Sequence, residues 1–358
     1  MDEERTAALV DRMVGDVLGT LSTFSVYLGG RLGLYRALAS GGPATAGELA
    51  ARAGIAERYA REWLEQQAVN ELLDVVEPSA DAAQRRYVLP AAHAAVLVDR
   101  DSLAFLAPFA ALAGAVGPQL PALLDAYRTG SGVPWSAFGA EMREAQGDAN
   151  RPMFLHQLVQ EQLPQIADVH ARLQTPGARV ADIGCGMGWS SIAMALGYPG
   201  VTVDGYDVDE PSVEAARAHA QQYGVAERVR FHAVDPVEAA GGYDLVTAFE
   251  CIHDMPRPVE VLATMRRLAA GGGTVLVMDE RVAEEFGAAD SVGDPVERLM
   301  YGYSLLICLP DGMSHTPTAA TGTVMRPSTL RAYAQAAGFA DIEVLPVAHD
   351  FFRFYRLA

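Results

Sequence analysis

Cysteine is scarce in this sequence, which has only Cys185, Cys251 and Cys308 among its 358 residues. The three thiols are scattered and show none of the spacings of a metal-binding motif, so they do not indicate a disulfide framework. We expect all three to be small buried side chains.

Long hydrophobic runs are also missing, although half of the residues are hydrophobic. We find no apolar run of about 18 residues that would suggest a membrane span. The first residues, MDEERTAALVDRM, are acidic and amphipathic, unlike a signal peptide with its basic start and apolar core. The sequence therefore predicts a cytoplasmic protein that does not interact with a membrane.

Positive charge is in deficit, with 27 Lys and Arg against 45 Asp and Glu, a formal net charge of -18. Nucleic-acid binding depends on a basic surface, so this balance argues against a DNA or RNA partner and favours a small-molecule ligand. At 358 residues the chain is long enough for two domains with a sizeable core.

The most informative stretch is a predicted strand, Arg179 to Ile183, followed by three alternating glycines and then a predicted helix, Trp189 to Leu196. Glycine allows a positive φ and a close approach of a ligand to the backbone. The free amides at the start of the helix suit an anionic group. Glycines alone are weak evidence, because tight strand-to-helix turns need them for structural reasons.

Further predicted strands place polar groups at their carboxyl ends, where ligands bind in α/β sheets. Asp207 ends the second strand, 19 residues beyond Gly188, and Asp235 follows the third. His253 and Asp254 follow the fourth. The expected strands are Val201 to Tyr206, Val229 to Ala233, Tyr243 to Phe249, Gly273 to Met278, Ile342 to Val347 and Phe351 to Arg356.

This D-x-G-x-G-x-G pattern with its spaced acidic strand ends resembles the class I S-adenosylmethionine (SAM)-dependent methyltransferases. The resemblance implies an α/β fold with a Rossmann-like, seven-stranded domain. It implies that Asp207 accepts the ribose hydroxyls and that Asp235 holds the adenine amino group. The full predicted SAM-binding set is Asp182, Gly184, Gly186, Gly188, Asp207, Val208, Asp235, Pro236 and Phe249.

The N-terminal region has helical spacing over Thr6 to Phe24 and Val26 to Leu38, then a helix–turn–helix pattern over Ala44 to Leu73. Two short strands within Leu72 to Leu89 predict a wing. The second helix of the pattern has more acids than arginines, which suits DNA poorly. Small-molecule methyltransferases similar to this chain carry such a winged-helix domain for dimerisation, so we expect a homodimer, with a DNA-binding regulator as the alternative.

We therefore expect a mostly helical winged-helix dimerisation domain at 1–95, a helical linker and substrate lid at 96–175, and the catalytic domain at 176–358. The lid includes a helix from Met153 to Leu173, kinked at Pro164, and the catalytic domain carries an insertion with a helix from Asp294 to Ile307. Predicted substrate contacts are Arg128, Met153 and Tyr301.

His253 and Asp254 are the predicted catalytic residues, and two mechanisms remain open. In one, His253 is a general base for O-methylation of a phenolic or polyketide acceptor. In the other, which we favour here, His253, Asp254 and the distant His315 bind iron, zinc or a similar metal ion that acidifies a 2-oxo acid. That second reading follows a resemblance to bacterial 2-oxo acid C-methyltransferases of secondary metabolism, which act on phenylpyruvate-type substrates.

Two further alternatives remain. His253 would be purely structural if it only bridges a loop while His315 lies in solvent. The chain would be a non-enzymatic regulator if its SAM-binding domain served as a sensor.

Overall fold

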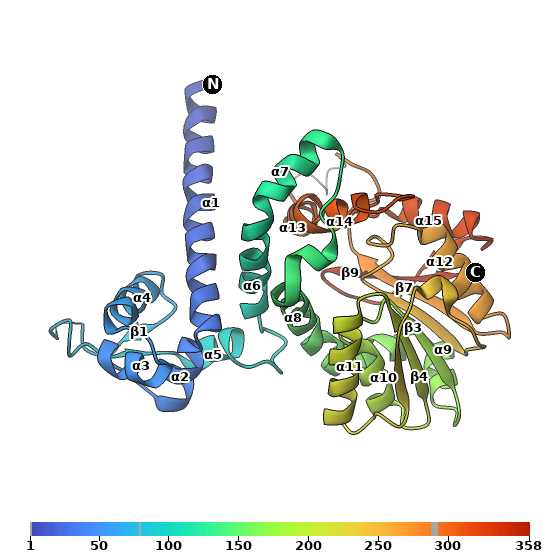
Figure 1. Cartoon of the computed structure of the whole chain (residues 1–358), viewed down its shortest axis with the longest axis horizontal. Helices are drawn as coiled ribbons and strands as arrows, with labels where there is room; N and C mark the ends of the chain where they lie inside the picture. The colour runs from blue at the N-terminus through green and yellow to red at the C-terminus, as the bar shows by residue number, and fades with distance from the viewer. Residues whose placement is uncertain (1, 79, 288–292) are drawn as a thin grey trace. The chain divides into compact units, whose positions relative to one another are not determined.

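The structure is a computed structural model that describes residues 2–78, 80–287 and 293–358 (Figure 1). The chain forms two compact units. The first comprises residues 1–117 and 144–152, and the second comprises residues 118–143 and 153–358. The segment 96–175, predicted as a helical linker and lid, is thus divided between the two units.

The first unit begins with one long helix, α1 (Asp2–Arg31), followed by α2 (Leu34–Gly41). The prediction of two helices separated near Ser25 is wrong. No proline or glycine breaks the helix at that position, and the chain turns only at Gly33, whose φ of 69° is left-handed.

The helix–turn–helix prediction is confirmed by α3 (Ala46–Ala53) and α4 (Glu57–Val69). Thr45 and Glu48 form a reciprocal capping box at the start of α3, and left-handed Gly54 ends it. Strands β1 (Asp74–Val75) and β2 (Tyr87–Val88) pair as an antiparallel wing. The predicted turn of this wing includes residue 79, which lies outside the described residues. Helices α5 (Ala91–Leu97) and α6 (Ala107–Val116) follow.

The second unit contains a seven-stranded sheet, ordered β5-β4-β3-β6-β7-β9-β8. Strand β9 is antiparallel to both β7 and β8, and the other neighbouring strands of this sheet are parallel. This confirms the predicted Rossmann-like topology with a C-terminal hairpin. The strands are β3 (Arg179–Ile183), β4 (Thr202–Asp207), β5 (Val229–Ala233), β6 (Leu245–Phe249), β7 (Thr274–Glu280), β8 (Ile342–Val344) and β9 (Phe352–Leu357).

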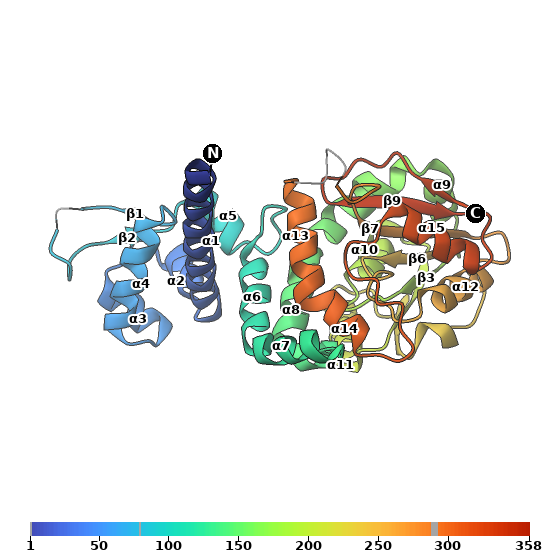
Figure 2. The ribbon, with the colours of Figure 1, turned by 90° about the horizontal axis from the view of Figure 1, so that it is seen from above.

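Helices cover both faces of this sheet (Figure 2). Helices α9 (Ala167–Leu173), α10 (Trp189–Gly197) and α11 (Glu210–Gln222) bury their apolar side chains in one core cluster. Helices α12 (Pro258–Leu268) and α15 (Pro327–Ala336) contribute to a second cluster. The two cores hold the carboxyl ends of the parallel strands in fixed register, which is where a ligand site is expected.

Further helices connect these elements, and one of them, the stretch Phe154–Gln162, adds Phe154 and Leu158 to the first core cluster. They are α7 (Leu120–Thr129), α8 (Trp135–Met153), a π-helical stretch (Phe154–Gln162), α13 (Pro295–Tyr303), a second π-helical stretch (Ser304–Cys308) and α14 (Leu309–Met313). The predicted helix from Met153 to Leu173 is interrupted, because Pro164 cannot donate a helical hydrogen bond. The insertion also includes residues 288–292, which lie outside the described residues.

One stretch, 107–129, is long and apolar enough to cross a membrane by length and composition alone. It consists of α6 and α7 joined by a 3₁₀ turn (Gly117–Gln119). Such a stretch also occurs in soluble proteins and is weak evidence for a span. The predicted localisation therefore stays a prediction.

Candidate active site

The turn between β3 and α10 has a left-handed backbone conformation that glycine adopts readily. Gly184, Gly186 and Gly188 have φ values of 67°, 49° and 83°. A Cβ on Gly184 would lie 2.7 Å from the Cys251 sulfur, and one on Gly188 would lie 2.6 Å from Phe231. A Cβ on Gly186 would meet no atom within 4 Å. The turn is therefore packed at both ends and open at its middle, as a cradle for a ligand must be.

Asp182 is buried, at 1% exposure, and turns into the protein. It accepts hydrogen bonds from the hydroxyls of Ser190 and Ser191, each at 2.6 Å, and of Thr247 at 2.7 Å. Burial raises the pKa of Asp182, and the three hydroxyls oppose that shift. Because these partners enclose its oxygens, the structure gives Asp182 the role of fixing the turn and not of contacting the ligand.

Asp207 stands at the tip of β4, next to the turn. One carboxylate oxygen accepts from the Gly186 amide at 2.8 Å, and the other accepts from the Asp209 amide at 2.9 Å. Burial raises the pKa of Asp207, while these amides lower it. A carboxylate can accept about four hydrogen bonds, and the backbone supplies three to Asp207, from Gly186, Val208 and Asp209, so Asp207 retains capacity for a hydroxyl of a ligand.

The other residues of the predicted SAM-binding set separate into two groups. Val208 is exposed, Asp235 is partly exposed, and Asp235 caps the short turn that begins with Pro236. Phe249 instead belongs to the core, at 6% exposure between Phe154 and Phe354. Successive side chains of a strand point to opposite faces, and Phe249 faces the covering helices. The predicted contact of Phe249 with SAM is therefore not supported.

His253 is buried after β6 and is held from two sides. Its Nδ1 lies 2.8 Å from an oxygen of Asp279 and 3.1 Å from an oxygen of Glu280, both at the end of β7. Its Nε2 lies 3.3 Å from Asp254. The imidazole is only 4% exposed and is therefore oriented by neighbouring acids and not by solvent.

These acids determine the protonation of the site. Burial disfavours the imidazolium, but the charges of Asp254, Glu280 and Asp279 outweigh it and raise the pKa of His253 well above its usual range. Burial raises the pKa of Glu280 well above its usual range. Burial acts in the same sense on Asp279, but the His253 charge and hydrogen bonds lower its pKa overall. The charge of His253 therefore favours the ionised form of Asp279, while burial favours the neutral form of Glu280.

The predicted metal triad is not assembled. In the described part of the chain, two groups of metal-ligating side chains include His253, one with Asp254 and Cys308 and one with Asp279 and Glu280. His315 belongs to neither group. It is 46% exposed, lies 3.7 Å from Asp311 and follows α14 in the chain. The ligand atoms of His253, Asp254 and Cys308 lie within 4.8 Å of one another.

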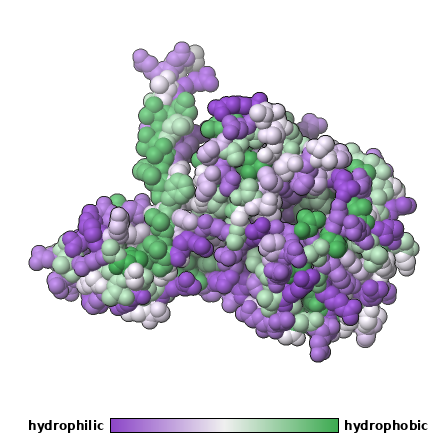
Figure 3. Space-filling model, viewed as in Figure 1, coloured by the Kyte–Doolittle hydropathy of each residue, from purple (hydrophilic) through white to green (hydrophobic). Residues whose placement is uncertain are grey.

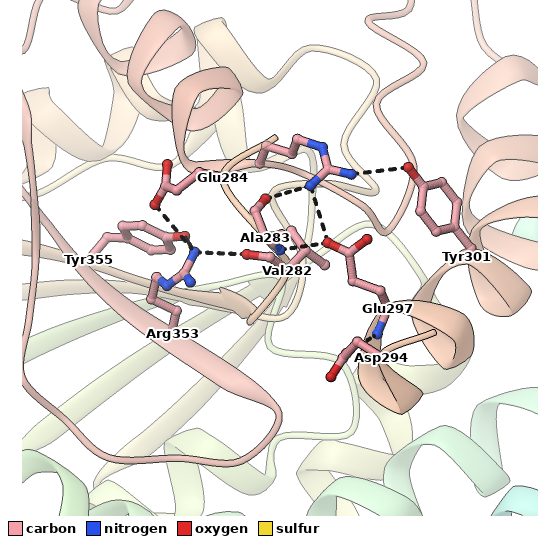
Figure 4. Close-up of polar contacts among 9 residues, drawn as sticks. Val282, Ala283, Glu284, Asp294, Glu297, Tyr301, Arg353 and Tyr355 are labelled. Atoms are coloured by element: carbon pink, nitrogen blue, oxygen red, sulfur yellow. Dashed lines mark hydrogen bonds and ion pairs between the residues drawn. The ribbon is translucent and has the colours of Figure 1, made fainter. Parts of the chain in front are cut away.

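The predicted substrate residues are dispersed. Arg128 is exposed and pairs with Asp125 at 3.1 Å, and Met153 packs against the sheet core. Tyr301 is 39% exposed. Its hydroxyl accepts a hydrogen bond from Arg326 at 3.1 Å, and Arg326 also contacts the buried Glu297 (Figure 4). These contacts join α13 to the residue before α15, which is a structural role for Tyr301.

The sequence pattern gives no role in this site to Cys308 or Asp311, and it fits Asp279 and Glu280 either to substrate contacts or to a solvated charge cluster. The signal for Asp279 and Glu280 was available, since they are the last residues of β7, whose carboxyl end lies beside that of β6. Asp311 is 15% exposed and accepts a hydrogen bond from the Trp135 amide at 2.7 Å. No local pattern connects residues so far apart in the chain.

Comparisons with known proteins bear on this site. Residues 174–298 match the model of a methyltransferase domain, and residues 19–99 match that of an Rv2258c-like winged HTH domain. A ubiquinone biosynthesis O-methyltransferase of Xanthomonas campestris pv. campestris is 31% identical over 194 residues, which are 53% of this chain and 73% of that protein. The chain belongs to the class I SAM-dependent methyltransferases. It is accordingly an enzyme, and the regulator alternative is not retained.

Another relative and two solved structures are also methyltransferases by name. A ubiquinone biosynthesis O-methyltransferase of Bordetella avium is 37% identical over 123 residues, covering 34% of this chain and 49% of that protein. The structure of human N-acetylserotonin methyltransferase in complex with SAM has a TM-score of 0.70 at 19% identity, covering 97% of each chain. Mitomycin 7-O-methyltransferase has a TM-score of 0.68 at 21% identity, covering 98% of each chain. These two structures share the fold.

Proposed function

We propose that this enzyme methylates a hydroxyl oxygen of a small-molecule acceptor and that His253 is the general base. The observation that carries the proposal is the orientation of His253, whose Nδ1 is anchored by Asp279 at 2.8 Å. An anchored Nδ1 orients the imidazole, and Nε2, which lies 3.3 Å from Asp254, is the atom that exchanges a proton with the acceptor. Relatives named as O-methyltransferases support the same choice.

The cofactor supplies an electrophilic methyl group bonded to a sulfonium sulfur. We assign its ribose to Asp207, its adenine to Asp235, and its remaining contacts to Gly184, Gly186, Gly188, Val208 and Pro236. The open middle of the glycine turn and the spare acceptor capacity of Asp207 fit this group. With the cofactor bound, His253 would take the hydroxyl proton on Nε2 while the cofactor would supply the methyl group to the oxygen. The proton balance requires His253 to be neutral when the acceptor arrives.

The test is methyl transfer to a panel of phenols by the wild-type enzyme and His253→Gln. Loss of a positioned general base lowers kcat by about 10²- to 10⁴-fold. Binding of S-adenosylhomocysteine, measured by calorimetry, should stay unchanged, because His253 is assigned to the acceptor. A variant that methylates phenols at the wild-type rate would refute the role of His253.

The structure gives less support to metal-assisted C-methylation of a 2-oxo acid than the sequence does. Its second histidine, His315, lies apart from His253 and Asp254. Cys308 occupies the third position of the cluster, so a metal there would have a nitrogen, an oxygen and a sulfur ligand. Soft thiolate ligands favour zinc or iron–sulfur chemistry over the chelation of a 2-oxo acid.

We also propose that the enzyme is a homodimer that associates through α1 in the winged-helix region, 1–95. Residues 2–21 of α1 are exposed on every side, and Figure 3 shows apolar residues gathered along this helix. Six of them alternate in steps of four and three residues and are 41–59% exposed: Val10, Val14, Val17, Leu21, Phe24 and Leu28. This is the seam of a coiled coil, which fits the same helix of a second copy.

Light scattering after size-exclusion chromatography tests the dimer. Val14→Arg with Leu21→Arg places two charges in the seam and should give monomers. Ala8→Arg, on the other side of the same helix, is the matched control and should leave the dimer intact. A wild-type monomer at micromolar concentration would contradict the proposal.

A further inference from the structure

Residues 130–143, which we call the strap, belong to the second unit. The start of the strap is fastened to α14. A Cβ on Gly132 would lie 2.1 Å from the Ser314 nitrogen and 2.3 Å from the Pro310 oxygen, so only glycine fits. The amides of Val133 and Trp135 donate to Pro310 at 2.8 Å and to Asp311 at 2.7 Å. Asp311 lies close enough to Asp254 for the two charges to interact. This end of the strap therefore lies on the side of His253 and Asp254, which we call the acceptor side.

The other end of the strap is fastened to the cofactor loop. The Nε of Arg143 donates to an oxygen of Asp209 at 2.7 Å, and the two side chains are only 14% and 13% exposed. The same oxygen accepts from the amide and hydroxyl of Ser212 at 3.0 and 2.6 Å. The Asp209 amide donates to Asp207. One residue therefore separates Arg143 from the carboxylate assigned to the ribose.

We propose that Arg143 is a positioning residue that couples cofactor binding to the placement of the strap against the acceptor side. The proposal rests on the SAM site assigned above. A ligand on Asp207 fixes the loop 207–209, and Arg143 transmits that order to the strap through a shielded ion pair, which solvent weakens less than a surface pair. Coupling between two sites is reciprocal, so a strap held by Arg143 also raises the affinity for the cofactor.

The test is calorimetric binding of S-adenosylhomocysteine to Arg143→Gln, Arg143→Lys and a control. Arg143→Gln should bind about tenfold more weakly, a typical coupling between sites. Arg143→Lys restores the charge and should recover most of the affinity. Arg331→Gln is the control, because Arg331 also donates its Nε to an aspartate, Asp341, at 2.9 Å, but on the surface.

Hydrogen exchange of the strap supplies a second readout that a loss of stability alone does not reproduce. S-adenosylhomocysteine should protect residues 130–143 in the wild type and in Arg143→Lys, and protect them less in Arg143→Gln. Equal affinity and equal strap protection in Arg143→Gln and the wild type would overturn the coupling. A wild type that fails to bind S-adenosylhomocysteine would instead refute the cofactor assignment itself.

Discussion

The cofactor side and the acceptor side of the second unit are built differently. On the cofactor side, the turn after β3 and the tip of β4 lie within 30 residues, and most of the hydrogen bonds to Asp182 and Asp207 come from the same α/β units, with Thr247 added from β6. On the acceptor side, His253 meets Asp279 from the next strand and Cys308 from the insertion. A local motif specifies the first side, whereas the second depends on how distant segments pack.

This difference gives the largest expected effect. Asp207→Ala removes the carboxylate that holds the Gly186 amide and is assigned to the ribose, so affinity for S-adenosylhomocysteine should fall about 100-fold or more. His253→Gln, on the acceptor side, should bind it normally. Calorimetry on both variants separates the two sides. Equal losses of affinity in both variants would show that the two sides do not act separately.

The sequence was sufficient for the cofactor side for a physical reason. Glycines, an acidic strand end and one α/β repeat occur together in a short window, and each has its own steric or electrostatic requirement. The seven strands and the helix–turn–helix were predictable from the same local patterns. For Phe249 the spacing gives the position of a strand end but not the face its side chain takes, and the structure places this side chain in the core.

The acceptor side could be predicted only as far as His253 and Asp254. Asp279 and Glu280, which hold His253, are the last residues of a different strand, β7. Sequence alone does not say which of many carboxylates reaches an imidazole. The third metal ligand was sought among histidines, but the π-helical stretch Ser304–Cys308 brings a thiol to the cluster, whereas His315 pairs with Asp311. The strap contacts, such as Trp135 with Asp311, span more than 170 residues.

A second prediction tests whether the strap shapes the acceptor side. Gly132→Ala would place a methyl group against the backbone of α14 and should push the strap away. We expect kcat/KM for the acceptor to fall about tenfold, since a displacement of about 1 Å near a reacting group is costly. Gly30→Ala, where a Cβ meets no atom within 4 Å, is the control. An unchanged kcat/KM in Gly132→Ala would show that the acceptor does not depend on the strap.

A third prediction concerns pH. Because the surrounding acids raise the pKa of His253, the neutral base forms at a higher pH than a free imidazole does, and the rate should increase with pH up to that range. Asp254→Asn removes one of the charges that raise this pKa, while burial, which lowers it, remains. The rising limb of the kcat/KM profile, which reports deprotonation of His253, should therefore move to lower pH. A limb that stays in place would mean that another group controls the rate.

The smallest expected effect is that of metal removal. If His253 acts as a base, no metal is needed to acidify the acceptor, so enzyme treated with a chelator should keep its activity within about twofold. Plasma mass spectrometry of the wild type, His253→Ala and Cys308→Ser checks the premise directly. One tightly held ion per chain, lost in both variants and needed for activity, would instead make Cys308 a metal ligand. The acceptor side would then differ from the cofactor side in its chemistry as well as in its construction, and 2-oxo acids would return as substrates to assay.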